Sequence, residues 1–500
     1  MAFFSSPITP YAASVALGIA AWWIHGSSKA KRDNPQGLPL PPGPKGYPII
    51  DNLLDFPTFR PWLVYDEWSK IYALRGRMIS FEKRSSNYSD RNRMPMLNEL
   101  MDWTWNLGLM PYGIWWRRHR RTFHHQFHPN VVHKYHSTQV DTTRAFLRHL
   151  LESPDRFFEH VRYAFASTIL KIGYGITVDN DEEAYELVKT GEIALSSLAE
   201  VGNPGSFLVD LFPAMKYIPS WFPGAGWKKK AEYWRTISHR FLKKPWSMSR
   251  EQYVSYQIFL ATIHPDESIE AAEAEEIARN TCAVAFGAGS DTTVSTVQSY
   301  FMAMALYPEV QKKAQEELDR VLGGRLPEFS DRPNLPYVNA ILKESMRWQL
   351  VTPLAVPHKA SEADEYDGYH IPKDTIVIGN SWSILHDPQV YKDPFTYNPE
   401  RFLKGGKIDR TIRDPTVAFF GFGRRICPGR FFSENAMFIL IAHILTVFDV
   451  RPDLDSNGEE IKINPEMTNG LISYPEPFQC KITPRSSKAE QLIRSSGLME

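Results

Sequence analysis

The chain has 500 residues, with 57 Lys and Arg against 57 Asp and Glu, so its formal net charge is zero. This balance shows no basic excess that would indicate a nucleic-acid partner, and no acidic tail is visible. Its three scattered cysteines argue against a disulfide framework and indicate a reducing compartment for the main body. No repeat or linker divides the chain after its first forty residues, so we expect one large α-rich domain.

The N-terminal segment is an uncharged apolar run over residues 8–24 that ends in Trp22 and Trp23. Basic residues follow it between positions 29 and 32, and no Lys or Arg precedes it. A secretory signal peptide would carry positive charge before the apolar run, so secretion is the weaker interpretation. The positive-inside rule leaves the bulk of the protein on the cytosolic side. We expect residues 1–26 to form a single transmembrane anchor.

Residues 27–48 combine basic residues with a proline-rich stretch, which predicts a stiff hinge between anchor and globule. The first marked helix is Pro111 to Phe123, where Trp116 and Arg120 lie one turn apart on one face. Further cations on this helix form either a solvated face or a docking surface for an acidic partner; they are Arg117, Arg118 and Arg121. Apolar spacing predicts further helices at Arg144 to Leu151 and Val161 to Ile172.

A very long helical pattern runs from Glu273 to Leu306 and is stopped by Pro308. Within it, the run from Ala288 to Thr293 has a low helix propensity, because Gly, Asp and Thr are unfavourable inside a helix. Small residues there leave room for a bulky group across the helix, and Thr292 can hydrogen-bond locally and produce a kink. Asp291 supplies an ionisable group for proton delivery. The motif alone fits a purely structural kink equally well.

Helices are also predicted at Glu309 to Leu322 and Tyr337 to Leu350, after which the helical pattern ends. Glu344 and Arg347 are spaced i, i+3 on the second of these, which by itself is a common exposed pair. Between residues 354 and 380, short β-like runs alternate with turns. The expected fold is therefore mainly α with small β-sheets.

The run from Phe420 to Gly429 places Cys427 in a glycine-punctuated loop, just ahead of an apolar helix from Phe431 to Phe448. Unpaired N–H groups and the helix dipole at that end stabilise a thiolate over a thiol. Glycines allow close approach of a flat ligand, and Arg425 can meet a carboxylate at its edge. A lone cysteine in a turn is more often structural, but a thiolate under a planar dicarboxylate indicates haem iron.

These ten residues resemble the haem-binding loop of cytochromes P450. The same family is indicated by Trp116-x-x-x-Arg120, by the long-helix motif, and by Glu344-x-x-Arg347 with the Asn398–Phe402 run. The resemblance extends from the proline hinge to Phe478. Three short segments resemble those of fungal, basidiomycete-like P450s of secondary metabolism, including the O-methylsterigmatocystin oxidoreductase type. They are Glu82-Lys83-Arg84-Ser85, Tyr88-Ser89-Asp90-Arg91 and Trp221-Phe222-Pro223-Gly224.

The resemblance implies a P450 fold after a transmembrane helix, with a catalytic domain over residues 49–485 and a C-terminal tail over 486–500. It implies haem b, with Cys427 as the axial iron ligand. Four residues would hold the haem propionates and edge: Trp116, Arg120, His358 and Arg425. Thr292 would donate a hydrogen bond in the oxygen-activation groove while Asp291 relays protons. A buried structural network of Glu344, Arg347 and Arg401 would brace the haem loop.

The implied activity is a haem-thiolate monooxygenase that inserts one atom of O₂ into a small lipophilic substrate. A terpenoid, polyketide or aromatic molecule of secondary metabolism, or a xenobiotic, would fit. Electrons would come from NADPH through cytochrome P450 reductase at the endoplasmic reticulum membrane, with cytochrome b5 as a further partner. Two alternatives stay open: a P450-fold peroxide isomerase or dehydratase needing no reductase, and a haem binder without activity. Peroxide isomerases and dehydratases of this fold usually lack the Asp-Thr pair in the long helix, which this chain keeps at Asp291 and Thr292.

The chain departs from the family pattern after Tyr72, where only Ala73 to Phe81 separates Tyr72 from the segment that begins at Glu82. About twenty residues, one β-hairpin, are missing there, through a real shortening or an error in the predicted gene. The first sheet is affected and the expected haem site is not. Apolar pocket residues are expected from three places: Ala285, Phe286 and Ala288 on the long helix, Leu354 to Val356, and the Trp103 to Pro111 loop.

Overall fold

The computed structural model describes residues 33–47, 52, 55–72, 82–178, 182–203, 205–251 and 270–497. The predicted membrane anchor at 1–26 and the predicted shortening at 73–81 lie outside these residues. Within them, one helix, α17 (Arg430–Val447), is long and apolar enough to cross a membrane, and most of it is buried inside the protein. Its apolar composition is therefore explained by its place in the core.

The predicted fold class, mainly helical with small sheets, is confirmed. The helices are α2 (Pro61–Ile71), α4 (Ile114–Phe127), α5 (His136–Glu152), α6 (Phe157–Tyr174), α7 (Glu182–Val201), α8 (Leu208–Leu211), α9 (Gly226–Glu251), α11 (Ala271–Gly289), α12 (Thr292–Leu306), α13 (Pro308–Leu322), α14 (Pro336–Trp348), α15 (Ser381–Leu385), α16 (Thr416–Phe419), α17 and α18 (Ser487–Ser495).

The described strands form four antiparallel pairs, each of two strands. They are β1 (His358–Lys359) with β4 (Ile376–Val377), β2 (Asp364–Tyr366) with β3 (Tyr369–Ile371), β5 (Leu403–Lys404) with β6 (Lys407–Ile408), and β7 (Phe448–Pro452) with β8 (Cys480–Pro484). The turn between β2 and β3 uses positive φ at Asp367 and Gly368, as the Asp-Gly pair predicts. The β-like runs predicted after α14 therefore form two small antiparallel pairs, of which β2 and β3 make a hairpin.

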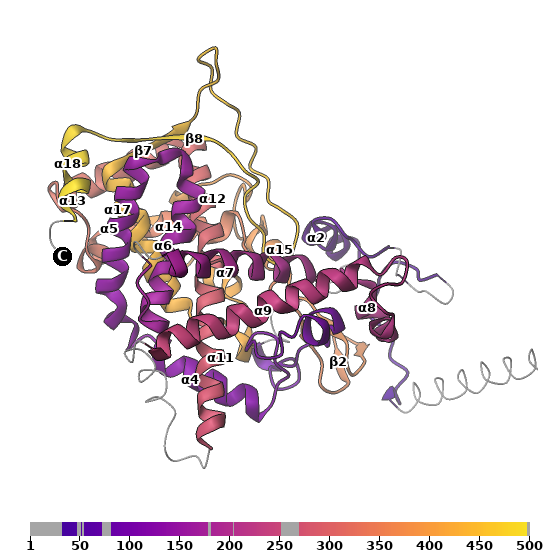
Figure 1. Ribbon diagram of the computed structural model, residues 1–500. Coiled ribbons are helices and arrows are strands. Elements are labelled where there is room, and N and C mark those ends of the chain that lie inside the picture. The colour runs from indigo at the N-terminus through magenta and orange to yellow at the C-terminus, as the bar shows by residue number, and fades with distance from the viewer. Residues whose placement is uncertain are drawn as a thin grey trace, which may run out of the picture.

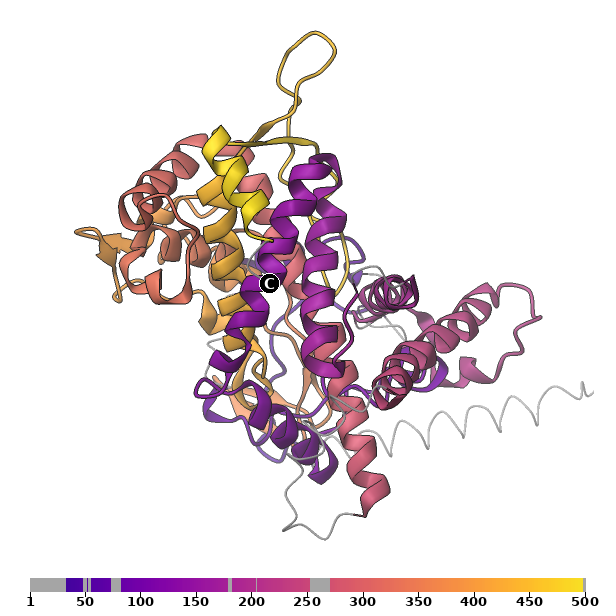
Figure 2. The ribbon, with the colours of Figure 1, turned by 60° about the vertical axis from the view of Figure 1, so that its left-hand side comes forward.

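A first hydrophobic core surrounds α17, which packs against α5, α13, α14 and α12 (Figure 1). Helix α17 is apolar on nearly all sides because neighbours cover nearly all of it. The C-terminal segment belongs to this core as well. Its helix α18 packs on α5 and α17 and buries Ala489 and Ile493. Figure 2 shows α18 as the yellow helix beside α5. Residues 487–495, within the predicted C-terminal tail, therefore form a helix that packs on this core.

A second core lies under α7 and α9, which run side by side across α6 and α11 (Figures 1 and 2). It contains a group of large aromatic side chains that includes Trp103, Trp105 and Phe241. Sequence patterns did not single out either helix. Helix α9 is rich in cations and carries Pro245 inside it, which obscures its amphipathic period. The space between the two cores holds the site described below.

The predicted long helix is interrupted, because α11 ends at Gly289 and α12 begins at Thr292. At the break, the Thr292 hydroxyl donates to the Ala288 carbonyl at 2.7 Å, which is the local hydrogen bond expected from the sequence. Gly289 explains the close approach of α6, since a Cβ there would lie 2.7 Å from Cγ1 of Ile169. The bulky group admitted at Gly289 is therefore a neighbouring helix.

Candidate active site

An internal cavity of about 290 Å³ lies where the two cores meet. The loop from Phe419 to Gly429 lines one side, and Ala285, Ala288 and Thr292 of the interrupted helix line another. The remaining wall is apolar and strongly aromatic; it includes Trp103, Trp105, Phe123, Phe127, Ile169, Leu195, Leu198, Phe241, Leu471 and Ile472. Such a lining favours an apolar, flat or bulky ligand.

Cys427 faces this cavity from a loop that only glycine-rich sequence can form. Gly421 and Gly423 have φ values of 75° and 54°, which side chains with a Cβ rarely adopt. The Cys427 N–H donates to the Phe420 carbonyl at 2.7 Å and closes the loop ahead of α17. Cys427 keeps partial exposure because the cavity reaches it. The thiol is thereby fixed and accessible from one side.

The surroundings of Cys427 shift the pKa of its thiol in opposite directions. Burial raises the pKa of the thiol, whereas the Gly429 N–H and the charges of Arg120 and Arg430 lower it. Burial is the largest of these effects, so the helix N-terminus and nearby cations do not by themselves favour the thiolate. A cationic metal centre at the sulfur would supply the missing stabilisation, because thiols that bind metals are deprotonated.

Four basic side chains line the cavity: Arg91, Arg120, His358 and Arg425. Burial lowers the pKa of Arg120 to about 10 and that of Arg425 to about 10. Burial and the charges of Arg91 and Arg425 lower the pKa of His358 to about 3, so this imidazole is neutral at pH 7. Its Nδ1 lies 2.6 Å from the Tyr88 carbonyl oxygen. Three guanidinium groups therefore concentrate positive charge at one end of the cavity.

These guanidinium groups differ in how they are held. Arg425 donates to the carbonyls of Ser89, Leu107 and Met110 at 2.7–3.3 Å, and its Cζ lies 4.5 Å from the Trp116 ring centre. Arg91 likewise donates to three backbone carbonyls. In the described part of the chain, neither residue forms an ion pair with a carboxylate, and none is found for Arg120. Carbonyls satisfy donors without neutralising charge, so the cationic end suits an anionic ligand.

The residues present thus fit a planar, dianionic metal cofactor. Cys427 offers a soft sulfur ligand at the cavity surface, and the arginines offer donors for carboxylates at one end. Aromatic and aliphatic side chains cover the rest. This donor set is the one that haem with a cysteine ligand requires.

Thr292 and Asp291 are neighbours in sequence but face different surroundings. Thr292 lines the cavity, whereas Asp291 is 1% exposed and does not belong to the lining. The Asp291 carboxylate accepts hydrogen bonds from Arg162 of α6, at 2.7 Å, and from the Tyr474 hydroxyl. The interruption between α11 and α12 separates the two side chains in this way. The sequence correctly placed Thr292 at the cavity but did not indicate the partners of Asp291.

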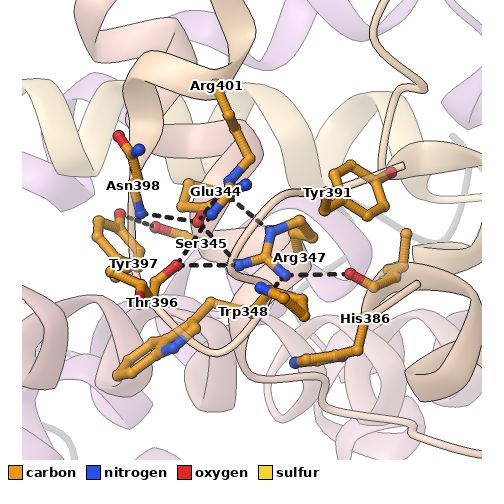
Figure 3. Close-up of polar contacts among 12 residues, drawn as sticks. Glu344, Ser345, Arg347, Trp348, His386, Tyr391, Thr396, Tyr397, Asn398 and Arg401 are labelled. Carbon is orange, nitrogen blue, oxygen red and sulfur yellow. Dashed lines mark hydrogen bonds and ion pairs between the residues drawn. The ribbon is translucent and has the colours of Figure 1, made fainter. Parts of the chain in front are cut away.

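The predicted network of Glu344, Arg347 and Arg401 is present; the first two side chains are fully buried and that of Arg401 is 8% exposed (Figure 3). Arg347 donates to both Glu344 oxygens, at 2.7 and 2.8 Å, and Arg401 Nε donates to Oε1 at 3.2 Å. The Asn398 N–H adds a further donor at 2.8 Å. The two guanidinium groups also donate to carbonyls between residues 385 and 396. The network ties α14 to this loop, and it lies apart from the cavity lining.

The basic side chains of α4 do not all point freely into solvent, because some of them contact other parts of the protein. Arg118 pairs with Glu273 of α11, and Arg117 lies over the Tyr112 ring at 5.6 Å. His119 is buried between Trp115 and Asn280. Among the described residues, no group of three or more His, Cys, Asp or Glu is arranged to hold a metal ion.

Six predicted residues meet at the cavity: Trp116, Arg120, Thr292, His358, Arg425 and Cys427. Phe286, also expected there, instead stacks on Phe241 at 5.1 Å within the second core. Cys282 and Cys480 are buried in α11 and β8, away from this cavity. Sequence analysis missed Arg91, which two of its three carbonyl contacts tie to residues 265 and 266 positions away. A buried arginine of this kind leaves no local periodic signal.

Comparison with known proteins agrees with this geometry. Residues 78–482 match the family described as Cytochrome P450. The chain is 43% identical to Cytochrome P450 monooxygenase COX2 of Coprinopsis cinerea, with 97% of this chain and 96% of that protein covered. It is 40% identical to Cytochrome P450 monooxygenase COX1 of the same fungus, with 95% and 97% covered. It is 38% identical to Tryptamine 4-monooxygenase of Psilocybe cyanescens, with 90% and 94% covered. The chain therefore belongs to the cytochrome P450 family and is a monooxygenase of the fungal type.

Proposed function

We propose that this protein inserts one oxygen atom of O₂ into a small, neutral, lipophilic substrate bound in the cavity above Cys427. The observation that carries this proposal is the convergence of Cys427, three buried guanidinium groups and Thr292 on one apolar cavity. When bound, haem would supply the oxygen-activating chemistry, as thiolate ligation favours O–O cleavage. The relatives named above as monooxygenases support the same reaction class.

Each cavity residue has a defined task in this proposal. Cys427 would hold the iron, and Arg120 with Trp116 would hold one propionate from α4. Arg425 and His358 would complete the cationic end, with Arg91 as a further cation beside them. Thr292 would hold and pass a proton at its hydroxyl, with Asp291 as the acid behind it. The aromatic wall would orient the substrate and exclude water.

The substrate class follows from the cavity lining. Its charged members all lie at the cationic end, and no Asp or Glu lines the described cavity. Trp103 and Trp105 are stacked with ring centres 5.0 Å apart, which gives a flat, rigid wall. We infer a terpenoid, polyketide or aromatic substrate of secondary metabolism, or a xenobiotic, without a charged group near the reacting carbon.

Electrons would reach the haem from NADPH through cytochrome P450 reductase, and cytochrome b5 is a further candidate donor. The apolar segment at residues 8–24 supports a single-pass anchor in the endoplasmic reticulum membrane with the catalytic domain in the cytosol. The decisive experiment is the absorption spectrum of the reduced, carbon-monoxide-bound full-length protein in yeast microsomes. A long-wavelength Soret band is expected, followed by reductase-dependent NADPH consumption. A short-wavelength band would contradict thiolate ligation.

Thr292→Ala is expected to retain haem and the long-wavelength band while diverting reducing equivalents to peroxide. The variant removes the hydroxyl that now donates to Ala288 and that would pass a proton inside the cavity. General acid–base groups typically contribute about 10²–10⁴-fold to a rate, so product per NADPH should fall steeply. Peroxide and NADPH are measured together. Thr293→Ser, which keeps the neighbouring hydroxyl, is the matched control. Tight coupling in Thr292→Ala would rule out the proton role of Thr292.

Arg120→Ala is expected to weaken haem retention by about tenfold or more, since one hydrogen bond to a charged group contributes about 1.5–3 kcal/mol. Arg117→Ala is the matched control, because Arg117 lies on the same helix, is exposed and does not line the cavity. Haem content per protein is measured by the pyridine haemochrome method during transfer to apomyoglobin. Equal haem loss from both variants would contradict the propionate role of Arg120.

A further inference from the structure

Asp102 lies directly before the aromatic wall of the cavity and has an unusual backbone. Its φ of 56° falls in the left-handed region, which few residues other than glycine adopt, although aspartate tolerates it better than most. Trp103 and Trp105 follow it, line the cavity and are 1% and 7% exposed. Because the backbone angles of Asp102 set the direction of the next residue, the contacts that hold Asp102 also place Trp103.

Two adjacent residues of α9 hold Asp102 from outside the cavity. His239 Nε2 lies 2.8 Å from Oδ2 of the Asp102 carboxylate, and the Ser238 hydroxyl donates to the Asp102 carbonyl at 3.4 Å. The buried Ser238 hydroxyl also accepts a hydrogen bond from Trp105 Nε1 at 3.2 Å. Helix α9 therefore fixes the residue that precedes the wall and one member of the wall itself.

The Asp102 carboxylate stays ionised in this setting. Burial raises its pKa, whereas hydrogen bonds from His239 and Thr104 and the charge of Arg235 hold the pKa below its ordinary value. An ionised carboxylate only accepts hydrogen bonds, so His239 donates from Nε2. The Asp102 and His239 side chains are 33% and 36% exposed. Solvent weakens such a contact, so we expect it to affect the adjoining wall more than the stability of the whole fold.

Trp103 depends on Asp102 more than Trp105 does. Its indole nitrogen is buried and has no hydrogen-bond partner among the described residues, so no polar contact of its own holds the ring. The ring instead stacks on Trp105, with centres 5.0 Å apart, and its centre lies 6.4 Å from that of Phe241 on α9. Stacking alone permits sliding of the rings. Relaxation of the Asp102 backbone would therefore displace Trp103.

We propose that His239 is a positioning residue, which holds Asp102 in its left-handed conformation and thereby keeps the Trp103–Trp105 stack in place at the cavity. This inference rests on the proposed function, because it concerns which molecules that cavity accepts. A ligand with a flat ring gains contact from a fixed wall and loses it when the wall moves, whereas a ligand too small to reach the wall does not. His239 does not line the cavity, so it determines specificity without touching the substrate.

The test measures how the purified full-length holoprotein binds two haem ligands of different size, imidazole and 4-phenylimidazole, by difference absorption spectra. Both bind through a ring nitrogen, so the phenyl group alone reports on the wall. His239→Ala should weaken the binding of 4-phenylimidazole by about threefold to tenfold, the range for loss of one hydrogen bond, and leave the binding of imidazole unchanged. Arg240→Ala is the matched control, because Arg240 is the next residue of α9, is exposed and does not line the cavity.

His239→Gln tests the hydrogen bond itself, because the glutamine side chain can donate from its own Nε2 to the same carboxylate. Its Kd for 4-phenylimidazole should lie close to that of the wild type. Equal Kd values for His239→Ala and Arg240→Ala would overturn the proposal. A loss in His239→Ala that His239→Gln does not restore would overturn it as well.

A second readout requires no ligand. Two indoles stacked 5.0 Å apart couple their electronic transitions and give a paired signal in circular dichroism. The contribution of this pair is the signal that Trp103→Phe removes. His239→Ala should lose part of that signal and Arg240→Ala none of it, and an unchanged signal in His239→Ala would overturn the proposal. A wild-type protein without the thiolate-type carbon-monoxide spectrum would instead refute the proposed function, while the dichroism comparison would still decide the role of His239.

Discussion

Cys427→Ser is expected to abolish the long-wavelength band of the reduced, carbon-monoxide-bound protein and all reductase-dependent turnover. Serine keeps the size of the side chain and the loop hydrogen bond of residue 427, which uses the backbone N–H. It removes the only cavity-lining sulfur in the described part of the chain. A hydroxyl is far less acidic than a thiol and is a hard ligand, so it cannot replace the soft thiolate. The band should move to shorter wavelength or disappear.

Cys480 supplies the control for this prediction. Cys480→Ala removes a thiol that is buried in β8 and lies outside the cavity. Burial raises the pKa of Cys480 to about 12, so this thiol is not a nucleophile or a ligand near neutral pH. Its spectrum should equal that of the wild type. An unchanged spectrum in Cys427→Ser, or a lost band in Cys480→Ala, would refute the assignment of the ligand.

Glu344→Ala is expected to destabilise the protein by about 3–5 kcal/mol, the cost typical of breaking a fully buried ion pair. Glu344 and Arg347 have 0% exposed side chains, and Glu344 accepts hydrogen bonds from two arginines and the Asn398 N–H. Removing it leaves the Arg347 charge buried beside backbone carbonyls only. The loop from residue 385 to 401 would lose its attachment to α14. Expression of folded haem protein should then fall sharply.

The matched control is Glu490→Ala on α18, which breaks an exposed i, i+4 pair with Arg494. Such a pair contributes less than about 1 kcal/mol, so thermal unfolding should hardly change. Both variants are compared with the wild type by their unfolding midpoints and by haem content. Similar midpoints for the two variants would show that the buried network does not support the fold.

Local sequence patterns were sufficient to predict the features that depend on residues close together in the sequence. The glycine-rich loop, the Thr292 kink and the Glu344–Arg347 spacing all depend on contacts within a few positions, and each appears as predicted. The break in the long helix was thus predicted at the right place. The side-chain partners of Asp291 at this break were not, because they lie 129 and 183 positions away.

What the sequence could not predict depends on packing between distant segments. Helices α7 and α9 form the cavity roof, yet their apolar faces are mixed with cations and, in α9, with Pro245. Arg91 is fixed by carbonyls at 108, 356 and 357, and Phe286 turns to Phe241 rather than to the cavity. The protonation of Cys427 likewise depends on how deeply tertiary structure buries it. None of these is a local property.

The cationic end of the cavity also bears on how much of this protein a cell can keep. Arg91, Arg120 and Arg425 are buried close together, and in the described structure no carboxylate pairs with them. A ligand that binds only the folded state raises its stability in proportion to the logarithm of ligand concentration over Kd. A dianionic cofactor would neutralise this repulsion, so polypeptide made when haem is scarce should unfold and be degraded. The supply of haem, as well as transcription, would then set the abundance of the enzyme.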